Sequence, residues 1–402
     1  MSLKKVAIVG AGVTGLTTAI LLRLSGYEVH VFTRTYPTIN HSNPFFASAF
    51  PAASILPHSV MSPISKKLFL DSTTFYKQLF ERKFSGINRQ IHYEVFSEPT
   101  QNNPVYLQWL PGYTELSLDS RSFIPHIPHY PVSRAWKFPM FFVDWPIYWN
   151  SLLTIFSTLE IPLSIEKVEF SRLNSKFPAS NYSLVIIASG SGFEQMYNKP
   201  IHLLKGHLIT ISNGPKLYNP DGNLFSYNYT PPKKVYRTLN GKAQDVYCYP
   251  RNGNIILGGS RIAGRLIGER WEGDEPLSNY KEMESPLDSP YSAIFKLNKT
   301  LIEHCTHARI FESQIHSTLH GYRYLGPNSS LYYKIDSSND VPHIHAYGLG
   351  GSGVTLSWGL AKDITRKADK LLMFPNGKDD LQDRSFMRAE EFANKLAELD
   401  AK

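Results

Sequence analysis

The sequence predicts an α/β protein in which a Rossmann-type nucleotide-binding domain is interleaved with an antiparallel-sheet domain. Glycine-rich turns that lead into helices stand at both ends of the 402-residue chain, at Lys4–Leu16 and His345–Gly359. Because these turns are so far apart, one nucleotide-binding domain must be assembled from separated segments. The antiparallel domain is predicted by the strand-like runs His207–Ser212 and Val246–Gly259 in the middle of the chain.

The first glycine turn lies in a βαβ opening. Lys5–Val9 is a short apolar, β-branched run typical of a buried parallel strand. A helix is predicted over Thr14–Leu24, where Gly26 ends it, and a second strand over Glu28–Phe32. This strand–turn–helix–strand context is what a glycine motif needs to indicate a nucleotide site.

The remaining elements follow from periodicity and turn residues. Further helices are predicted over Lys66–Arg82, Trp149–Leu159, Pro286–Thr306, Gly353–Leu372 and, at the surface, Met387–Leu399, and another buried strand over Ser183–Ala188. The polar segment Asn213–Asp245 is expected to be an irregular lid. We expect a discontinuous nucleotide-binding domain at 1–57, 146–200 and 321–373, a substrate domain at 58–145 and 201–320, and a charged tail at 374–402.

Composition argues against several classes of protein. The net charge of +8 comes from dispersed basic residues, whereas nucleic-acid binding needs a patch or stripe, so no nucleic-acid partner is expected. The two cysteines, Cys248 and Cys305, support neither a disulfide scaffold nor a metal site. No signal peptide is visible, and the apolar stretch Ala135–Phe156 is broken by charges and prolines, so we expect a cytoplasmic protein without a membrane span. A homodimer is left open.

The glycines of the first turn suit a dinucleotide. Gly10 permits the tight turn, Gly12 lets the backbone approach a pyrophosphate and Gly15 allows close helix packing. The phosphates would meet the helix N-terminus at Ala11, Val13 and Thr14. The acidic residue usual after the second strand is replaced by Thr33 and Arg34, which keeps NADP as an alternative.

The second turn makes FAD the leading cofactor. A nicotinamide enzyme does not need another glycine turn so far along the chain, whereas FAD can contact one turn with its adenine half and the other with its flavin. Backbone amides at a helix start can stabilise a reduced, anionic flavin. The residues predicted for this role are Gly350, Gly351, Ser352, Gly353, Val354 and Thr355.

These motifs resemble the D-amino-acid oxidase family, which includes the D-aspartate oxidases. The resemblance extends in order over most of the chain, and its most specific block is His345–Gly359. The blocks between the two glycine turns are Ala52-Ala53, Ser189-Gly190, Lys205-Gly206-His207, Tyr247–Gly259 and Gly321-Tyr322-Arg323. The predicted cofactor contacts outside the two turns are Thr33, Arg34, Ala52, Ala53, Val168, Ser189 and Gly190.

The resemblance implies oxidative deamination of a D-amino acid. In this family the substrate gives its α-hydrogen as hydride to flavin N5, and the imino acid hydrolyses to a 2-oxo acid and ammonia. Molecular oxygen then takes the electrons and becomes hydrogen peroxide. The flavin supplies the redox chemistry, while the protein supplies orientation and electrostatics.

The resemblance also implies roles for five residues at the substrate. Arg323 corresponds to the arginine that grips the α-carboxylate, a task suited to a planar guanidinium. Tyr247 would help to hold that carboxylate, and the Gly351 carbonyl would accept a hydrogen bond from the amine. Arg261 and His58 are similar to the D-aspartate oxidase branch and imply an acidic substrate, because a second cation selects a second carboxylate.

Two alternatives stay open. The chain has Leu349 where the family often has a histidine, and Arg323 is not followed by the usual proline and basic residue. An oxidase of glycine or of a secondary amino acid fits the same motifs. A flavin-binding protein with a degraded site, acting as an interaction module, is the alternative of another class.

Overall fold

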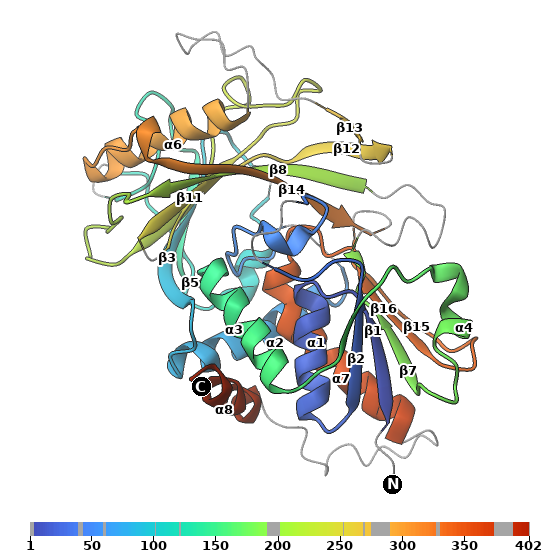
Figure 1. Cartoon of the computed structure of the whole chain (residues 1–402). Coiled ribbons are helices and arrows are strands. Elements are labelled where there is room, and N and C mark those ends of the chain that lie inside the picture. Colours follow the sequence, from blue (N-terminus) through green and yellow to red (C-terminus); the bar gives the residue numbers. More distant parts are fainter. Residues whose placement is uncertain are drawn as a thin grey trace. The chain divides into compact units, whose positions relative to one another are not determined.

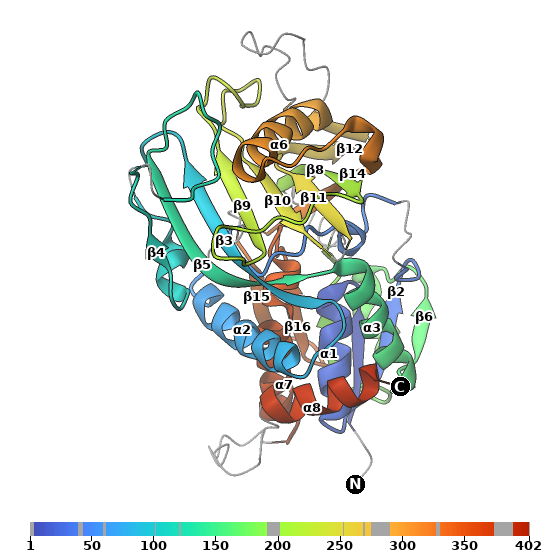
Figure 2. The same ribbon diagram turned by 90° about the vertical axis from the view of Figure 1, so that its left-hand side faces the viewer.

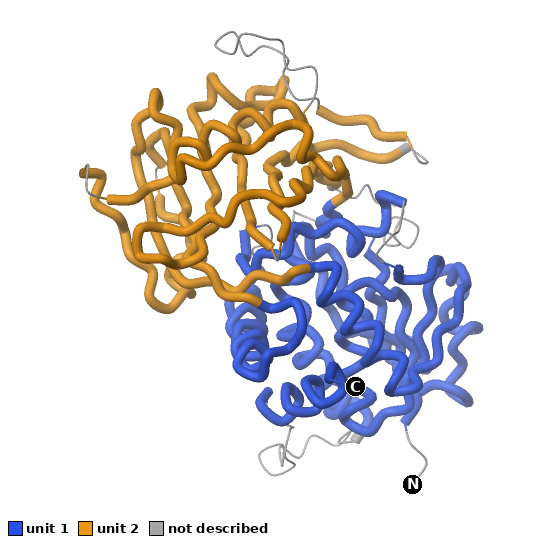
Figure 3. The backbone as a smooth tube through the Cα atoms, turned by 60° about the vertical axis from the view of Figure 1, so that its left-hand side comes forward, with its two compact units in different colours: residues 1–87, 145–202, 323–402 blue, residues 88–144, 203–322 orange. Residues whose placement is uncertain are grey.

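The chain forms two compact units, each built from segments far apart in the sequence (Figure 3). A computed structural model describes residues 4–38, 43–58, 62–100, 102–119, 122–190, 202–251, 253–267, 270–274, 290–326, 330–373 and 389–401. Unit 1 comprises Met1–Ile87, Trp145–His202 and Arg323–Lys402, and unit 2 comprises Asn88–Asp144 and Leu203–Tyr322. Residues 58–87, which we assigned to the substrate domain, therefore belong to unit 1.

Unit 1 contains a six-stranded sheet in the order β15-β16-β7-β1-β2-β6 (Figure 1). Five strands are parallel and β15 is antiparallel to β16. The central strands are buried apolar runs, as expected for a sheet covered on both faces. The strands are β1 (Lys5–Val9), β2 (Glu28–Thr33), β6 (Leu163–Ile165), β7 (Leu184–Ile187), β15 (Tyr332–Asp336) and β16 (His343–Tyr347).

In unit 1, the two helices that follow the glycine turns pack against each other. Helix α1 (Val13–Leu24) packs against β1 and β2, and α7 (Gly353–Met373), which follows the second turn, packs along α1. The remaining helices are α2 (Ser65–Glu81), α3 (Trp145–Thr158), α4 (Leu173–Lys176), α8 (Ala389–Asp400) and the 3₁₀ turns η1 (Ala47–Ala49) and η3 (Phe170–Arg172). The predicted surface helix is thus present as α8, although Met387 lies outside the described residues.

Helix α2 explains why residues 58–87 belong to unit 1. Its amphipathic apolar face packs on α7, where Phe75 stacks on Trp358 with ring centroids 5.6 Å apart. The two helices approach so closely that a Cβ at Gly359 would lie 2.0 Å from the Leu68 carbonyl oxygen. The Gly359 N–H also donates to Ser72 Oγ at 2.8 Å. Burial of this face is non-local, so the sequence pattern alone did not show which domain would take it.

Unit 2 is built on a ten-stranded sheet covered on one face by α6 (Pro290–Thr306) (Figure 2). Alternate residues of its central strands, such as Phe225, Tyr227, Val246 and Cys248, form a core with α6. The sheet consists of β3 (Ile87–Phe96), β4 (Thr114–Glu115), β5 (Arg134–Val143), β8 (His202–Ser212), β9 (Phe225–Thr230), β10 (Val246–Pro250), β11 (Asn254–Gly258), β12 (Ile262–Ile267), β13 (Arg270–Gly273) and β14 (Ile315–Leu325), with the 3₁₀ turns η2 (Val105–Trp109) and η5 (Glu312–Gln314).

The segment Asn213–Asp245 is not the irregular lid that we expected. It contains β9, which pairs in parallel with β3 and antiparallel with β10. Leu217 and Tyr236 on either side of β9 are also buried. Aromatic and polar residues alternate strictly along Phe225–Thr230, which is the period of a strand. The aromatic residues belong to the core with α6, and Ser226 and Asn228 on the other face are also buried. Among the described helices, none is long and apolar enough to span a membrane.

Candidate cofactor and substrate sites

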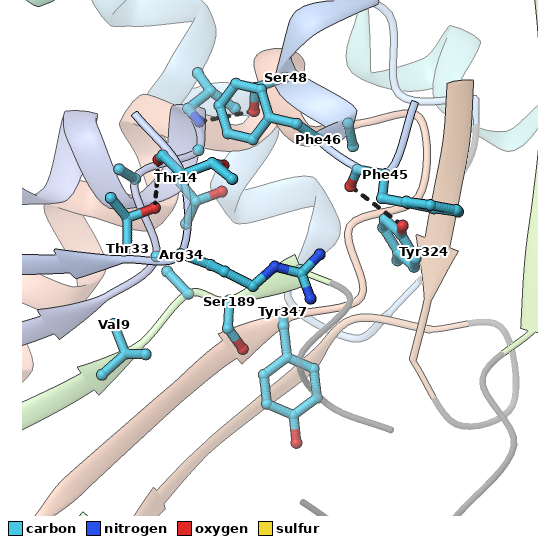
Figure 4. A pocket seen from close by; sticks show the side chains of 18 of the residues that line it. Val9, Thr14, Thr33, Arg34, Phe45, Phe46, Ser48, Ser189, Tyr324 and Tyr347 are labelled. Carbon is cyan, nitrogen blue, oxygen red and sulfur yellow. Dashed lines mark hydrogen bonds between the residues drawn. The ribbon is translucent and has the colours of Figure 1, made fainter. Parts of the chain in front are cut away.

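A pocket in unit 1 lies at the carboxyl ends of the parallel strands. Both glycine turns line it, together with the ends of β2 and β7 and the segment after β6 (Figure 4). Ligands of open parallel sheets bind at this edge, where the strand order reverses. The predicted residues among its lining are Gly10, Ala11, Gly12, Val13, Thr14, Thr33, Arg34, Val168, Ser189, Gly190, Gly350 and Gly353.

Glycine is present at the three positions of the first turn for different structural reasons. Gly10 has φ +113°, and a Cβ there would lie 2.4 Å from the Ala188 carbonyl oxygen. A Cβ at Gly15 would lie 1.9 Å from the Gly10 carbonyl oxygen, so the turn itself requires both glycines. Gly12 is different: it has ordinary extended φ and ψ values, and its Cβ would meet only Ser48 Oγ, at 3.0 Å. Of these three glycines, which begin α1 or precede it, Gly12 lines the pocket and is the one whose Cβ would meet a side chain rather than backbone.

The start of α1 offers hydrogen-bond donors to this space. Gly12 is the N-cap residue and makes no side-chain cap, so the first N–H groups of the helix have no partner within the helix. One of them, the Val13 N–H, donates to Ser48 Oγ at 2.9 Å. Ser48 lies in the loop after β2 and was not among the predicted contacts. A helix start of this kind favours an anion.

The wall of the pocket includes other residues that sequence reasoning missed. Tyr324 follows the predicted clamp Arg323, and its hydroxyl donates to the Phe45 carbonyl at 3.2 Å while its own carbonyl accepts from the Gly350 N–H at 2.8 Å. Tyr347 was also missed, and the predicted Arg34 extends over the pocket toward it and toward Ser189 (Figure 4). The only available signal for these residues was their position next to a predicted strand end or glycine turn.

Several predicted cofactor residues do not line this pocket. Thr355 is buried, and its hydroxyl donates to the Ser54 carbonyl at 3.1 Å, tying α7 to the loop before α2. Ala53 has φ +61°, a left-handed conformation that is uncommon for a residue with a Cβ. The predicted residues outside the lining are Gly15, Ala52, Ala53, Gly351, Ser352, Val354 and Thr355.

The five predicted substrate residues are divided between the units. Arg323, His58 and Gly351 belong to unit 1, whereas Tyr247 and Arg261 belong to unit 2. Arg323 lies half-buried on β14, His58 is partly exposed, and Gly351 is exposed in the turn before α7.

In unit 2, Tyr247 lies on the sheet face opposite the α6 core, where a polar network surrounds it. Its ring stacks on Tyr249 with centroids 4.5 Å apart. The Tyr249 hydroxyl donates to Asn228 Oδ1 at 2.6 Å, and Asn228 Nδ2 donates to the buried Glu94 at 2.9 Å. Burial and the charge of Glu94 raise the pKa of Tyr106 well above 10, so the Tyr106 hydroxyl stays protonated beside this carboxylate.

Arg261 has an acidic partner in the same unit. Its Nη2 lies 3.0 Å from Asp245 Oδ2, and its backbone N–H donates to Gln244 Oε1 at 2.6 Å. The Arg261 side chain keeps 39% of its surface exposed, whereas Asp245 keeps 12%. A further carboxylate reaching Arg261 would therefore have to share it with Asp245. The described residues contain no group of three or more potential metal ligands.

Comparison with known proteins agrees with a flavin-dependent oxidoreductase. A D-amino-acid oxidase from Rubrobacter xylanophilus is 23% identical over 372 residues, which cover 92% of this chain and 97% of that protein. A crystal structure of glycine oxidase from Geobacillus kaustophilus matches with TM-score 0.64 and 14% identity, over 92% of this chain and 95% of that one. Iminodiacetate oxidase from Chelativorans sp. BNC1 matches with TM-score 0.60 and 15% identity, over 92% and 95%.

The mixed α/β architecture of the chain is the fold of these solved structures. Residues 5–367 match the model of the FAD dependent oxidoreductase family, DAO, and the chain belongs to that family. Its cofactor is FAD. The NADP alternative is therefore set aside.

The pocket of unit 1 fits this cofactor. The space at Gly12 and the donors at the start of α1 suit a pyrophosphate. In the lining of this pocket, the Ser189 hydroxyl oxygen is buried without a hydrogen-bond partner among the described residues. Such groups are costly unless a ligand or water satisfies them.

Proposed function

We propose that this protein catalyses the FAD-dependent oxidative deamination of a D-amino acid. A D-amino acid, oxygen and water would give a 2-oxo acid, ammonia and hydrogen peroxide. FAD held in the pocket of unit 1 would supply the two-electron redox chemistry between the amino acid and oxygen. The single observation that carries the proposal is that one family model of FAD-dependent oxidoreductases spans residues 5–367, including both glycine turns of the pocket.

The substrate assignment is supported by the likeness to a D-amino-acid oxidase over nearly the full length of both chains. The chain would hold the α-carboxylate with Arg323 and Tyr247 and accept a hydrogen bond from the amine at the Gly351 carbonyl. A bidentate guanidinium contact orients a carboxylate and so points the α-hydrogen in one direction. Tyr247 has a phenolic hydroxyl that can donate to a carboxylate, and its ring stacks on Tyr249 with centroids 4.5 Å apart.

A preference for an acidic side chain remains the more specific part of the proposal. It depends on Arg261 and His58, by resemblance to the D-aspartate oxidase branch. The Asp245 carboxylate at 3.0 Å weighs against it, because the charge of Arg261 is already balanced. Glu94 adds a second carboxylate near the same guanidinium. Relative rates on D-aspartate, D-glutamate and D-alanine would measure the preference.

Glycine or a secondary amino acid is the second candidate substrate. The similarity in fold to a glycine oxidase and an iminodiacetate oxidase favours keeping it. A degraded flavoprotein that serves as an interaction module is the third candidate. The cytoplasmic location, the use of oxygen and a homodimer stay predictions.

One experiment separates these functions. The purified yellow protein is mixed anaerobically with D- and L-amino acids, glycine and sarcosine, and loss of the flavin absorbance is followed. Bleaching by D-amino acids but not L-amino acids supports the proposal. Bleaching by glycine or sarcosine alone supports the second candidate, and no bleaching by any compound supports the third. Peroxide formation after admission of air then tests oxygen as the acceptor.

A further inference from the structure

The end of β2 lacks the group that usually binds a nucleotide ribose. In dinucleotide-binding folds an acidic side chain near this strand end accepts hydrogen bonds from the ribose hydroxyls. Here Thr33 ends β2, and its hydroxyl donates to the Thr35 carbonyl at 3.0 Å. Arg34 follows, and a guanidinium has donors but no acceptor. The pocket therefore needs a carboxylate from elsewhere if the ribose is held in the usual way.

Such a carboxylate directly follows the neighbouring strand, β6. β6 runs parallel to β2 at the edge of the sheet, with Ile165 in register with Thr33. Glu166 is the next residue, and its N–H donates to the Thr33 carbonyl at 2.8 Å. Glu166 is therefore level with the end of β2. It lines the same pocket as Gly10 and Gly12.

The contacts of Glu166 leave room for a ligand. Its Oε2 accepts a charge-assisted hydrogen bond from Lys176 Nζ at 2.6 Å. This contact uses one oxygen, and the side chain keeps 38% of its surface exposed. A carboxylate has about four acceptor positions, so it can bind Lys176 and the hydroxyls of a sugar together. Lys176 also restricts the side chain, which lowers the entropy lost on binding.

We propose that Glu166 binds the ribose hydroxyls of the adenosine half of FAD, in place of the acidic residue that β2 lacks. The inference rests on FAD binding by unit 1 and does not depend on which amine is oxidised. Its failure would thus leave the proposed function untouched, and an enzyme inactive on D-amino acids would not affect it.

The test compares FAD with an analogue in which the adenosine ribose is 2′,3′-dideoxyribose. Both are titrated into apoprotein, and dissociation constants are obtained from the change in flavin fluorescence. The wild type should bind FAD about tenfold or more tightly than the analogue, since charge-assisted hydrogen bonds are lost. Glu166→Gln should weaken FAD by a similar factor and bind the two cofactors almost equally.

Two controls separate a ribose contact from other effects. Glu169→Gln removes a nearby exposed carboxylate, which pairs with Arg172 and does not line the pocket, and should keep wild-type discrimination. An FAD analogue with hypoxanthine in place of adenine tests the alternative that Glu166 meets the adenine amino group.

Three results would overturn the inference. The first is a wild type that does not distinguish FAD from the dideoxy analogue, a result that needs no variant to fold. The second is discrimination that survives in Glu166→Gln. The third is a Glu166→Gln variant that loses discrimination against the hypoxanthine analogue alone.

Discussion

Replacing Gly12 with valine should remove FAD while leaving the fold intact. A Cβ at Gly12 meets only the end of the Ser48 side chain, at 3.0 Å, and the backbone there is extended with φ −72°. The apoprotein should lose the hydrogen bond from the Val13 N–H to Ser48, about 1 kcal/mol, and a further amount of about 1 kcal/mol because valine is a poorer N-cap than glycine. The added side chain would occupy the space proposed for the pyrophosphate, so the FAD dissociation constant should rise about 100-fold or more.

The expected effect on thermal stability follows from the linkage between FAD binding and folding. At an FAD concentration about 100 times the wild-type dissociation constant, binding stabilises the wild type by about 2.7 kcal/mol. A variant with a dissociation constant about 100-fold higher would gain only about 0.4 kcal/mol at that concentration. The wild type should therefore show a rise of several degrees in Tm on adding FAD, and Gly12→Val almost none.

The assay is thermal unfolding of apoprotein with and without FAD, alongside the flavin-to-protein absorbance ratio after purification. Gly15→Ala provides the contrast, because its Cβ would lie 1.9 Å from the Gly10 carbonyl oxygen and should destabilise the apoprotein itself. Full flavin occupancy and a wild-type Tm response in Gly12→Val would refute the placement of the pyrophosphate. An apo Gly12→Val that is as unstable as Gly15→Ala would show that the steric argument is wrong.

Three further predictions concern catalysis, specificity and pH. Arg323→Ala should keep the flavin but lower kcat/KM by a factor on the order of 10² or more. Near-normal turnover at low substrate concentration would show that Arg323 does not bind the α-carboxylate. Asp245→Asn frees Arg261 from its partner and should raise the kcat/KM ratio of D-aspartate to D-alanine about tenfold, whereas the control Glu272→Gln, at a partly exposed ion pair with Arg265, should not change it. An unchanged ratio in Asp245→Asn means that Arg261 does not meet the substrate side chain. Burial lowers the pKa of His345 from 6.5 to about 4. As the pH drops from about 6.5 to 4, His345 is therefore protonated in the unfolded chain before it is protonated in the folded protein, and the free energy of unfolding should fall by up to about 3 kcal/mol. His345→Gln should flatten that part of a urea-unfolding profile, and an unchanged pH dependence would contradict the assignment.

The parts of the fold that have a local cause could be predicted from the amino-acid sequence. The glycine spacing after a short apolar run predicted β1, the turn and α1, because a tight turn and close helix packing require glycine at defined positions. The second glycine turn predicted α7 in the same way, and the two turns together predicted FAD. The helices α1 and α7 were predicted to within one residue because each begins at a glycine turn, and Gly26 ends α1.

Contacts between segments that are far apart in the sequence could be seen only in the folded protein. β9 becomes a central strand because β3, more than a hundred residues earlier, pairs with it. The local alternation in Phe225–Thr230 indicates a strand but does not say which strand it will pair with. Glu166 lies beside Thr33 for the same reason: the register of β6 with β2 places it there. The motif around Arg261 suggested a role at the substrate. Its ion pair with Asp245 could not be predicted, because it depends on how the chain folds between the strands that carry the two residues. Local sequence specifies conformation, whereas contact between segments is decided by which faces are buried together, and that is a property of the whole chain.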